Sequence, residues 1–145
     1  MRASSRAPAV LLDTCAAIWI ANGDPLRAGA EARIVHAALA EGVFVSPVSA
    51  WEVGMLSRPR TGRAMEFLPD PASWFARLMA GPGVKPAAFT AQIAIAASQL
   101  PGDLHGDPAD RLLIATARHL AMPIVTRDAR ILAYALAGHV AGIPC

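Results

Sequence analysis

Short apolar runs alternate with longer helical patterns along this chain. Three runs, at Val10–Leu12, Val43–Val45 and residues 123–125, are too short for helices and are typical of buried strands. Two further strands are expected near Val84 and at residues 140–143. Because helical segments separate the strands, the pattern predicts right-handed crossovers and a mostly parallel sheet. The predicted fold class is therefore α/β, a three-layer α/β/α sandwich.

Several of the predicted helices begin at recognisable capping residues. Ser46 is expected to cap a helix that has Pro47 at its first position and runs to about residue 57. Asp107 is expected to cap a helix that runs to about residue 120, and Asp128 to open the next one. Further helices are expected at residues 14–21, 26–41, 71–79 and 90–100.

The composition is that of a globular protein. Of the 145 residues, 54% are hydrophobic and 17% are charged. This balance supports one packed core in a single domain spanning residues 1–145, and it excludes a disordered chain. The uncharged stretch at residues 86–102 is shorter than the roughly 20 residues that a membrane-spanning helix needs. No membrane association is therefore expected.

Two cysteines, Cys15 and Cys145, provide neither a disulfide framework nor the paired spacing of a zinc site. A reducing cytoplasm is therefore the expected location. Arg2 and Arg6, followed by apolar residues, imitate the start of a secretory signal. Asp13 interrupts the apolar stretch with an ionisable group, which argues against that interpretation.

Four acidic residues lie at positions that a parallel sheet would bring to the carboxyl ends of its strands, where functional sites occur. Asp13 directly follows one predicted strand, and Asp128 comes just after another. Glu52 lies in the helix after the second strand, and Asp110 lies in the first turn of a later helix. Because the carboxyl ends of parallel strands meet at one edge of the sheet, the four side chains can converge there. Helix capping is the alternative explanation for Asp128 and for Asp107, which has Asp110 three residues after it, as a capping box would.

Four carboxylates at one edge of a sheet would repel one another. Each pair about 5 Å apart costs roughly 3 kcal/mol at an effective dielectric of about 20, so the group must take up protons or bind cations. A set of oxygen ligands without His or Cys suits Mg²⁺ or Mn²⁺. Such an ion activates water and offsets the charge on a leaving oxygen, which predicts phosphodiester hydrolysis.

The net charge of the chain supports a polyanionic partner only when the four site acids are counted separately from the rest of the surface. The chain has 13 basic and 11 acidic residues, a net charge of +2. If four acids share one site, the other seven face 13 basic residues, which leaves +6 on the rest of the protein. Such a surface attracts nucleic acid. All basic residues except Lys85 are arginines, a bias that a GC-rich genome would also produce.

Four segments of the chain each combine an apolar run with one of these four acids: residues 10–14 (VLLDT), 46–53 (SPVSAWEV), 105–115 (HGDPADRLLIA) and 124–128 (IVTRD). In this order they resemble the motif blocks of PIN-domain ribonucleases, and in particular those of the VapC toxins of bacterial toxin–antitoxin pairs. Together the blocks stretch over most of the chain. One departure from the family is the run Cys15, Ala16 and Ala17, where relatives tend to have larger residues.

The resemblance implies an Mg²⁺- or Mn²⁺-dependent endoribonuclease that cuts tRNA or ribosomal RNA. It implies a homodimer and a VapB-like antitoxin whose C-terminal segment blocks the site. The implied catalytic and metal-binding acids are Asp13, Glu52, Asp110 and Asp128, with Asp13 and Asp110 favoured as direct ligands. Small polar residues near the site are Thr14, Ser49 and Thr126.

Other residues near the motifs have two interpretations each. Asp107 is either an acid behind the metal ligands or, as favoured here, only a helix cap. Arg111 and Arg127 either hold phosphate or pair with the site acids. His105 is either a substrate contact or, as favoured here, a solvent-facing hydrogen-bond donor. Cys15 is either a nucleophile or, as favoured here, a small packing residue. Three arginines form a basic loop that is expected to contact RNA, the antitoxin or only solvent: Arg58, Arg60 and Arg63. Three tryptophans are expected in the core or in a dimer interface: Trp19, Trp51 and Trp74.

Competing enzyme classes lack their required residues. A phosphoaspartate hydrolase needs an acid at the position of Cys15, and a receiver domain needs a strand-end lysine, whereas the single lysine is Lys85. No G-x-G-x-x-G follows the first strand, which disfavours dinucleotide binding. The remaining alternative is a non-catalytic PIN-like domain that binds protein or RNA.

Overall fold

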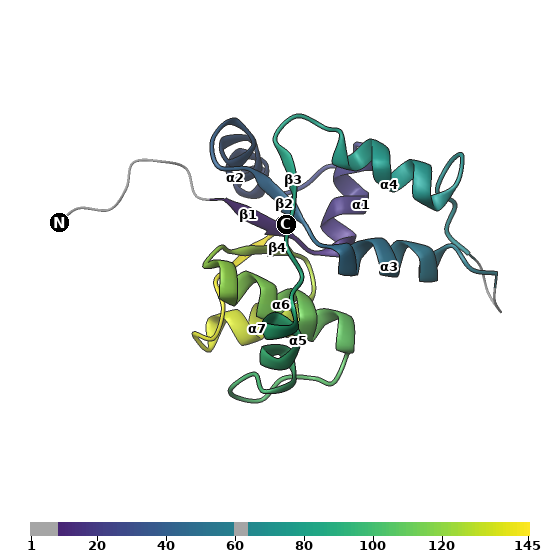
Figure 1. The fold of residues 1–145 in the computed structure, drawn as a ribbon. Coiled ribbons are helices and arrows are strands. Elements are labelled where there is room, and N and C mark those ends of the chain that lie inside the picture. The colour runs from purple at the N-terminus through teal and green to yellow at the C-terminus, as the bar shows by residue number, and fades with distance from the viewer. Residues whose placement is uncertain (1–8, 60–63) are drawn as a thin grey trace.

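The computed structural model describes residues 9–59 and 64–145 (Figure 1). Arg2, Arg6, Arg60 and Arg63 therefore lie outside the described residues. The elements are β1 (Val10–Leu12), α1 (Thr14–Asn22), α2 (Ala28–Leu39), β2 (Val43–Val45), α3 (Pro47–Leu56), α4 (Pro71–Met79), β3 (Val84–Pro86), α5 (Ala91–Ser98), α6 (Pro108–Leu120), β4 (Ile124–Thr126), α7 (Ala129–Leu136) and β5 (Gly142–Pro144).

The five strands form one parallel sheet in the order β3-β2-β1-β4-β5. From β1 the chain moves outward through β2 to β3, and it then returns to the other side of β1 for β4 and β5. The direction of winding therefore reverses between β1 and β4. In open parallel sheets, ligand sites lie beyond the carboxyl ends of the strands at such a reversal. The α/β class and the parallel sheet predicted from the sequence are confirmed.

Helices cover both faces of the sheet (Figure 1). On one face, Val10 and Leu12 pack into a core with residues of α1, α2 and α4. On the other face, Leu11 and Ile124 pack against α6 and α7, and α5 packs on α6. Successive strand residues point to opposite faces, so all three residues of β1 are buried. The central strand is thus covered on both faces, as expected for a strand made only of apolar residues.

The predicted helix starts agree closely with the structure. Ser46 accepts a hydrogen bond from the backbone N–H of Val48 at 3.0 Å, with Pro47 at the first helical position. Thr90 caps α5 rather than belonging to it, and β5 begins two residues later than the expected residue 140. In the described part of the chain, no helix is long and apolar enough to cross a membrane.

Candidate active site

Four acidic side chains from different elements meet at the carboxyl edge of the sheet. Asp13 follows β1 and Asp128 follows β4, the two strands on either side of the winding reversal. Glu52 comes from α3 and Asp110 from the first turn of α6. Each acid acts electrostatically on at least two of the others. The convergence expected from the sequence is therefore present in the structure.

Asp13 is the most deeply held of the four. Its Oδ2 accepts a hydrogen bond from the Thr126 hydroxyl at 2.7 Å, and its Oδ1 accepts one from the Thr14 backbone N–H at 2.8 Å. Burial raises the pKa of Asp13 to about 6, even though the Thr126 hydrogen bond lowers it. The charges of Asp110 and Asp128 raise this pKa further. The site therefore holds an ionised Asp13 near neutral pH only against an electrostatic cost.

A pair of hydroxyl groups holds Glu52. The Thr14 hydroxyl donates to Glu52 Oε1 and lies 2.9 Å from the Ser49 hydroxyl. Because Thr14 gives its only hydroxyl proton to Glu52, Ser49 must donate to Thr14. Burial raises the pKa of Glu52 to about 7, the Thr14 hydrogen bond lowers it, and the charge of Asp13 raises it. Thr14 thus connects the first strand's aspartate to the glutamate of α3.

Asp110 is fixed from two sides. Its backbone N–H donates to the side chain of Asp107 at 3.0 Å, so the predicted cap of α6 is confirmed. Its own Oδ2 lies 2.7 Å from His105 Nε2. Burial raises the pKa of Asp110, while the hydrogen bond from His105 lowers it. The Asp110 carboxylate faces His105 rather than the backbone of Asp107, so the capping box is only half formed.

Asp128 combines capping with a place in the acidic group, and its cap of α7 is confirmed. Its Oδ1 accepts from the backbone N–H groups of Arg130 and Ile131, at 2.8 and 3.3 Å. Its own N–H donates to the Thr126 hydroxyl at 3.0 Å. Burial alone would raise the pKa of Asp128, but these backbone hydrogen bonds and the Arg130 guanidinium lower it overall. Thr126 therefore links Asp13 to Asp128.

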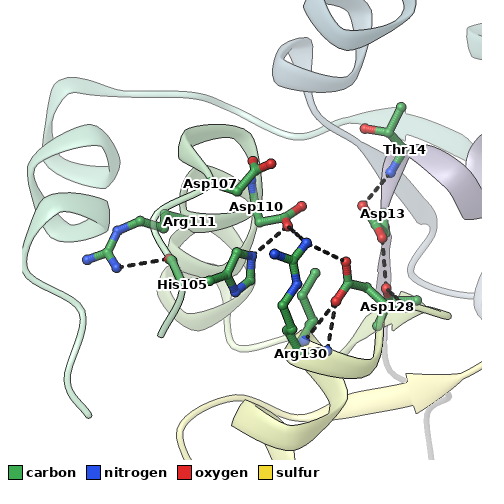
Figure 2. A network of polar contacts seen from close by, with 10 residues as sticks. Asp13, Thr14, His105, Asp107, Asp110, Arg111, Asp128 and Arg130 are labelled. Atoms are coloured by element: carbon green, nitrogen blue, oxygen red, sulfur yellow. Dashed lines mark hydrogen bonds and ion pairs between the residues drawn. The ribbon is translucent and has the colours of Figure 1, made fainter. Parts of the chain in front are cut away.

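Sequence patterns did not point to Arg130 as a residue of the site, and they predicted the wrong environment for His105. Arg130 Nη2 lies 3.4 Å from Asp128 Oδ2 and 3.9 Å from Asp110 Oδ2, so that its guanidinium stands between the two carboxylates (Figure 2). His105, expected to face solvent, is mostly buried against Asp110, and its Nδ1 has no hydrogen-bond partner. His105 lies inside the third motif segment, which could have indicated a place in the site. Arg130 lies two residues after the last motif segment, so no motif indicated it.

The two arginines next to the motif acids contact other groups. Arg111 donates through Nε to the carbonyl of Ala97 at 3.1 Å and through Nη1 to that of His105 at 3.5 Å. Arg127 lies over the ring of Trp19, 3.6 Å from its centroid, and donates to the Cys145 carbonyl at 3.1 Å. Neither guanidinium makes an ion pair with an acid among the residues described, so that alternative is wrong. Arg111 instead contacts α5 and the loop before α6, and Arg127 contacts α1 and the residue after β5.

Two further expectations require correction. Cys15 as a whole residue is exposed rather than packed, but partial loss of water around its thiol, together with the charge of Asp13, raises the pKa of the thiol to about 11. The thiol is therefore protonated at neutral pH and is a poor nucleophile. Trp51 is 59% exposed on α3, which excludes a place in the core. Trp74 packs edge-on against Phe67, with ring centroids 4.9 Å apart, as a core residue does.

The donor set of the site is chemically suited to a hard cation. The four acids and their neighbouring hydroxyls offer only oxygen ligands, which fit Mg²⁺ or Mn²⁺. Among the described residues, no three His, Cys, Asp or Glu side chains are already arranged around one point as metal ligands. Hydroxyl, imidazole and guanidinium donors of the protein engage the carboxylate oxygens instead. Coordination of one cation by three of these acids would therefore require their side chains to rearrange.

Comparisons with known proteins agree with this geometry. The PIN domain family matches residues 10–136. The chain is 34% identical over 124 residues to Ribonuclease VapC22 of Mycobacterium tuberculosis, covering 84% of this chain and 88% of that protein.

Solved structures with the same fold include two complexes. VapBC2 of Rickettsia felis bound to a promoter DNA fragment matches with a TM-score of 0.65 and 13% identity, covering 94% of this chain and 98% of that one. DNA-bound VapBC of Salmonella typhimurium matches with a TM-score of 0.61 and 15% identity, over the same shares of both chains. The chain belongs to the PIN domain family and, within it, to the VapC ribonucleases.

Proposed function

We propose that this protein is a divalent-metal-dependent endoribonuclease that hydrolyses phosphodiester bonds of RNA. The observation that carries the proposal is the group of four carboxylates at the carboxyl edge of the sheet, where the pKa values of Asp13, Glu52 and Asp110 are raised. Such a group is costly unless a cation or a proton neutralises it. The 34% identity to a protein named as a ribonuclease supports the choice of RNA.

Asp13 and Asp110 are proposed as direct ligands of Mg²⁺ or Mn²⁺, with Glu52 and Asp128 completing the set. When bound, the ion would activate a water molecule and offset the charge on the leaving oxygen. The protein's own hydroxyls prepare the ligands: Thr126 orients Asp13, and Thr14 orients Glu52. Asp107 acts behind them by fixing the first turn of α6.

Helix starts around the site favour a negatively charged substrate. The N-termini of α1, α6 and α7 all begin at aspartates of this region. Each N-terminus carries a partial positive charge, which stabilises nearby carboxylates and phosphates. Arg111 and Arg127 contact no site acid and remain candidates for holding RNA phosphates. We propose tRNA or ribosomal RNA as the substrate class.

The proposed partners are a VapB-like antitoxin and a second copy of the chain. The solved structures that share the fold are complexes whose names pair a VapC or FitB chain with VapB or FitA. Trp51, Met65 and Leu68 are exposed apolar side chains on α3 and on the segment before α4. Trp51 lies on α3, the helix that also carries Glu52, and this surface is proposed to receive the antitoxin segment. Phe89, before α5, and Ile95, within α5, are also exposed apolar side chains and are proposed for self-association.

Incubation of the purified chain with total RNA tests the proposal directly. Cleavage is expected with Mg²⁺ or Mn²⁺, and it should stop with EDTA and in Asp110→Asn. RNA that binds but stays intact under all metal conditions would favour the non-catalytic alternative. A mixture with the cognate VapB-like protein should elute as one complex and lose the cleavage activity.

A further inference from the structure

One positively charged side chain stands inside the acidic group. Arg130 Nη2 approaches Asp128 Oδ2 at 3.4 Å and Asp110 Oδ2 at 3.9 Å, so a single nitrogen faces carboxylates from two different helices (Figure 2). The guanidinium therefore supplies positive charge at a point where two of the proposed metal ligands meet. No other Lys or Arg side chain among the described residues makes an ion pair with the four acids.

The attachment of this guanidinium is weak. The Arg130 side chain is 61% exposed, and both of its contacts are longer than an optimal charged hydrogen bond. Exposed ion pairs of this kind contribute little to stability. The backbone of Arg130 is held separately, because its N–H donates to Asp128 Oδ1 at 2.8 Å. The side chain can therefore leave the carboxylates without disturbing the start of α7.

Space for a displaced guanidinium lies next to the site. A cavity of about 350 Å³ is lined by Arg130, His105 and Tyr134, among others. His105 touches Asp110, so this cavity adjoins the acidic group directly. An arginine that turns from the carboxylates toward this cavity presents a planar guanidinium, which suits phosphate oxygens.

We propose that Arg130 takes the place of the divalent ion between Asp110 and Asp128 and that the ion displaces it, after which its guanidinium binds an RNA phosphate. This inference rests on the function proposed above. Two cations cannot share the same carboxylate oxygens at such short distances without repulsion. Arg130 is thus a positioning residue that competes with the metal and then contributes to substrate binding.

Mn²⁺ binding to the RNA-free protein, followed by electron paramagnetic resonance, tests the competition. Arg130→Ala is expected to bind Mn²⁺ about two- to fivefold more tightly than the wild type, the range of one exposed ion pair. Arg130→Lys keeps the charge and should remain near the wild type. Arg33→Ala is the matched control, because it removes an exposed arginine from α2 on the other side of the sheet.

Binding of bulk tRNA, measured by fluorescence anisotropy in Ca²⁺ at several salt concentrations, tests the second step. Arg130→Ala should bind more weakly and lose about one phosphate contact from the salt dependence, whereas Arg130→Lys should recover most of it. Unchanged Mn²⁺ affinity in Arg130→Ala, or an unchanged salt dependence, would overturn the inference. The proposed function fails separately, if the wild type binds Mn²⁺ and tRNA but cleaves no RNA.

Discussion

Asp13 and Asp70 occupy equivalent local positions in two different regions of the molecule. Both precede a helix, and both accept a hydrogen bond from a backbone N–H of its first turn. At the exposed start of α4, backbone and hydroxyl donors of Ser73 hold the pKa of Asp70 below its usual value. At the carboxyl edge of the sheet, burial among other acids raises the pKa of Asp13 to about 6.

The comparison separates capping from function. A capping hydrogen bond stabilises the ionised carboxylate in both regions, so it cannot account for the opposite shifts. The deciding factors are loss of water and the presence of Asp110 and Asp128, which only the buried region provides. An aspartate that caps a helix and still has a raised pKa therefore marks a place where the protein accepts an electrostatic cost.

The same substitution at both positions gives the largest expected difference. Asp13→Asn should reduce RNA cleavage by more than about 100-fold, since it removes a metal ligand. It should also stabilise the metal-free protein by up to about 3 kcal/mol, because the pKa of Asp13 lies about two units above its unfolded value. Asp70→Asn should change neither property appreciably. Urea unfolding in EDTA and an RNA cleavage assay measure both effects, and a destabilised Asp13→Asn would favour a purely structural Asp13.

The raised pKa values of the buried acids should determine whether stability rises or falls with pH. Asp13 and Glu52 have folded pKa values of about 6 and about 7, above their ordinary values of 3.8 and 4.5, so the folded protein binds more protons than the unfolded chain between these limits. Stability of the metal-free protein should therefore fall as the pH rises from about 4 to about 7. The lowered pKa values of Asp70 and Asp128 act below that range, where their contribution is lost as the pH falls.

Urea unfolding at pH 5 and pH 7.5, with EDTA and with Mg²⁺, measures this dependence. Mg²⁺ should restore most of the stability lost at the higher pH, because it favours the ionised carboxylates. The double variant Asp13→Asn with Glu52→Gln should show a flatter pH dependence. A metal-free protein that becomes more stable between pH 5 and pH 7.5 would contradict the assigned sign.

Thr126→Val tests how the buried region holds its charge. The change removes the donor to Asp13 and the acceptor for the Asp128 N–H, with an expected cost of about 1 to 3 kcal/mol. The pKa of Asp13 should rise further, which would move the acid limb of the pH–rate profile to higher pH. Thr116→Val is the matched control, since Thr116 is also buried but its hydroxyl donates to Leu112 within α6. An equal shift of the profile in both variants would count against the role of Thr126.

Asp107→Ala should have the smallest effect of the series. It removes the cap of α6 and should cost about 1 kcal/mol of stability, with a modest loss of activity because Asp110 stays in place. Asp107→Ser should restore most of the stability, since serine is also a good cap. Thermal unfolding and the RNA cleavage assay compare the two variants. Complete loss of cleavage in Asp107→Ser with full stability would instead assign Asp107 to the metal site.

Most of the fold could be predicted because the apolar periodicity and the capping residues of each segment agree with the element that the segment forms. The start of α3 at Pro47 and the caps by Ser46, Asp107 and Asp128 depend on hydrogen bonds within a few residues, which a sequence displays directly. The end of α2 and the bounds of β5 were less accurate. Strand bounds depend on pairing with β4, whose register aligns Thr126 with Pro144 across the sheet.

The acidic residues of the site could be predicted from the sequence, but the contacts of its arginines could not. Asp13 and Asp128 were found because each follows an apolar strand, and parallel strands share one carboxyl edge. Arg130 and Asp110 lie 20 positions apart, and their contact depends on how α6 and α7 pack on the sheet. Arg111 and Arg127 were equally plausible in sequence, yet packing turns them toward carbonyl groups and Trp19.

The sequence by itself determined the parallel sheet, the helix starts and the identity of the four acids, because these follow from periodicity, capping chemistry and the shared direction of parallel strands. Only the tertiary structure decided how much water each acid loses and which cation stands beside it. Burial, hydrogen-bond donors and neighbouring charges together shift the pKa values of these carboxylates. The loss of water and the nearby cation depend on side chains that are distant in sequence, and no local pattern encodes their distances.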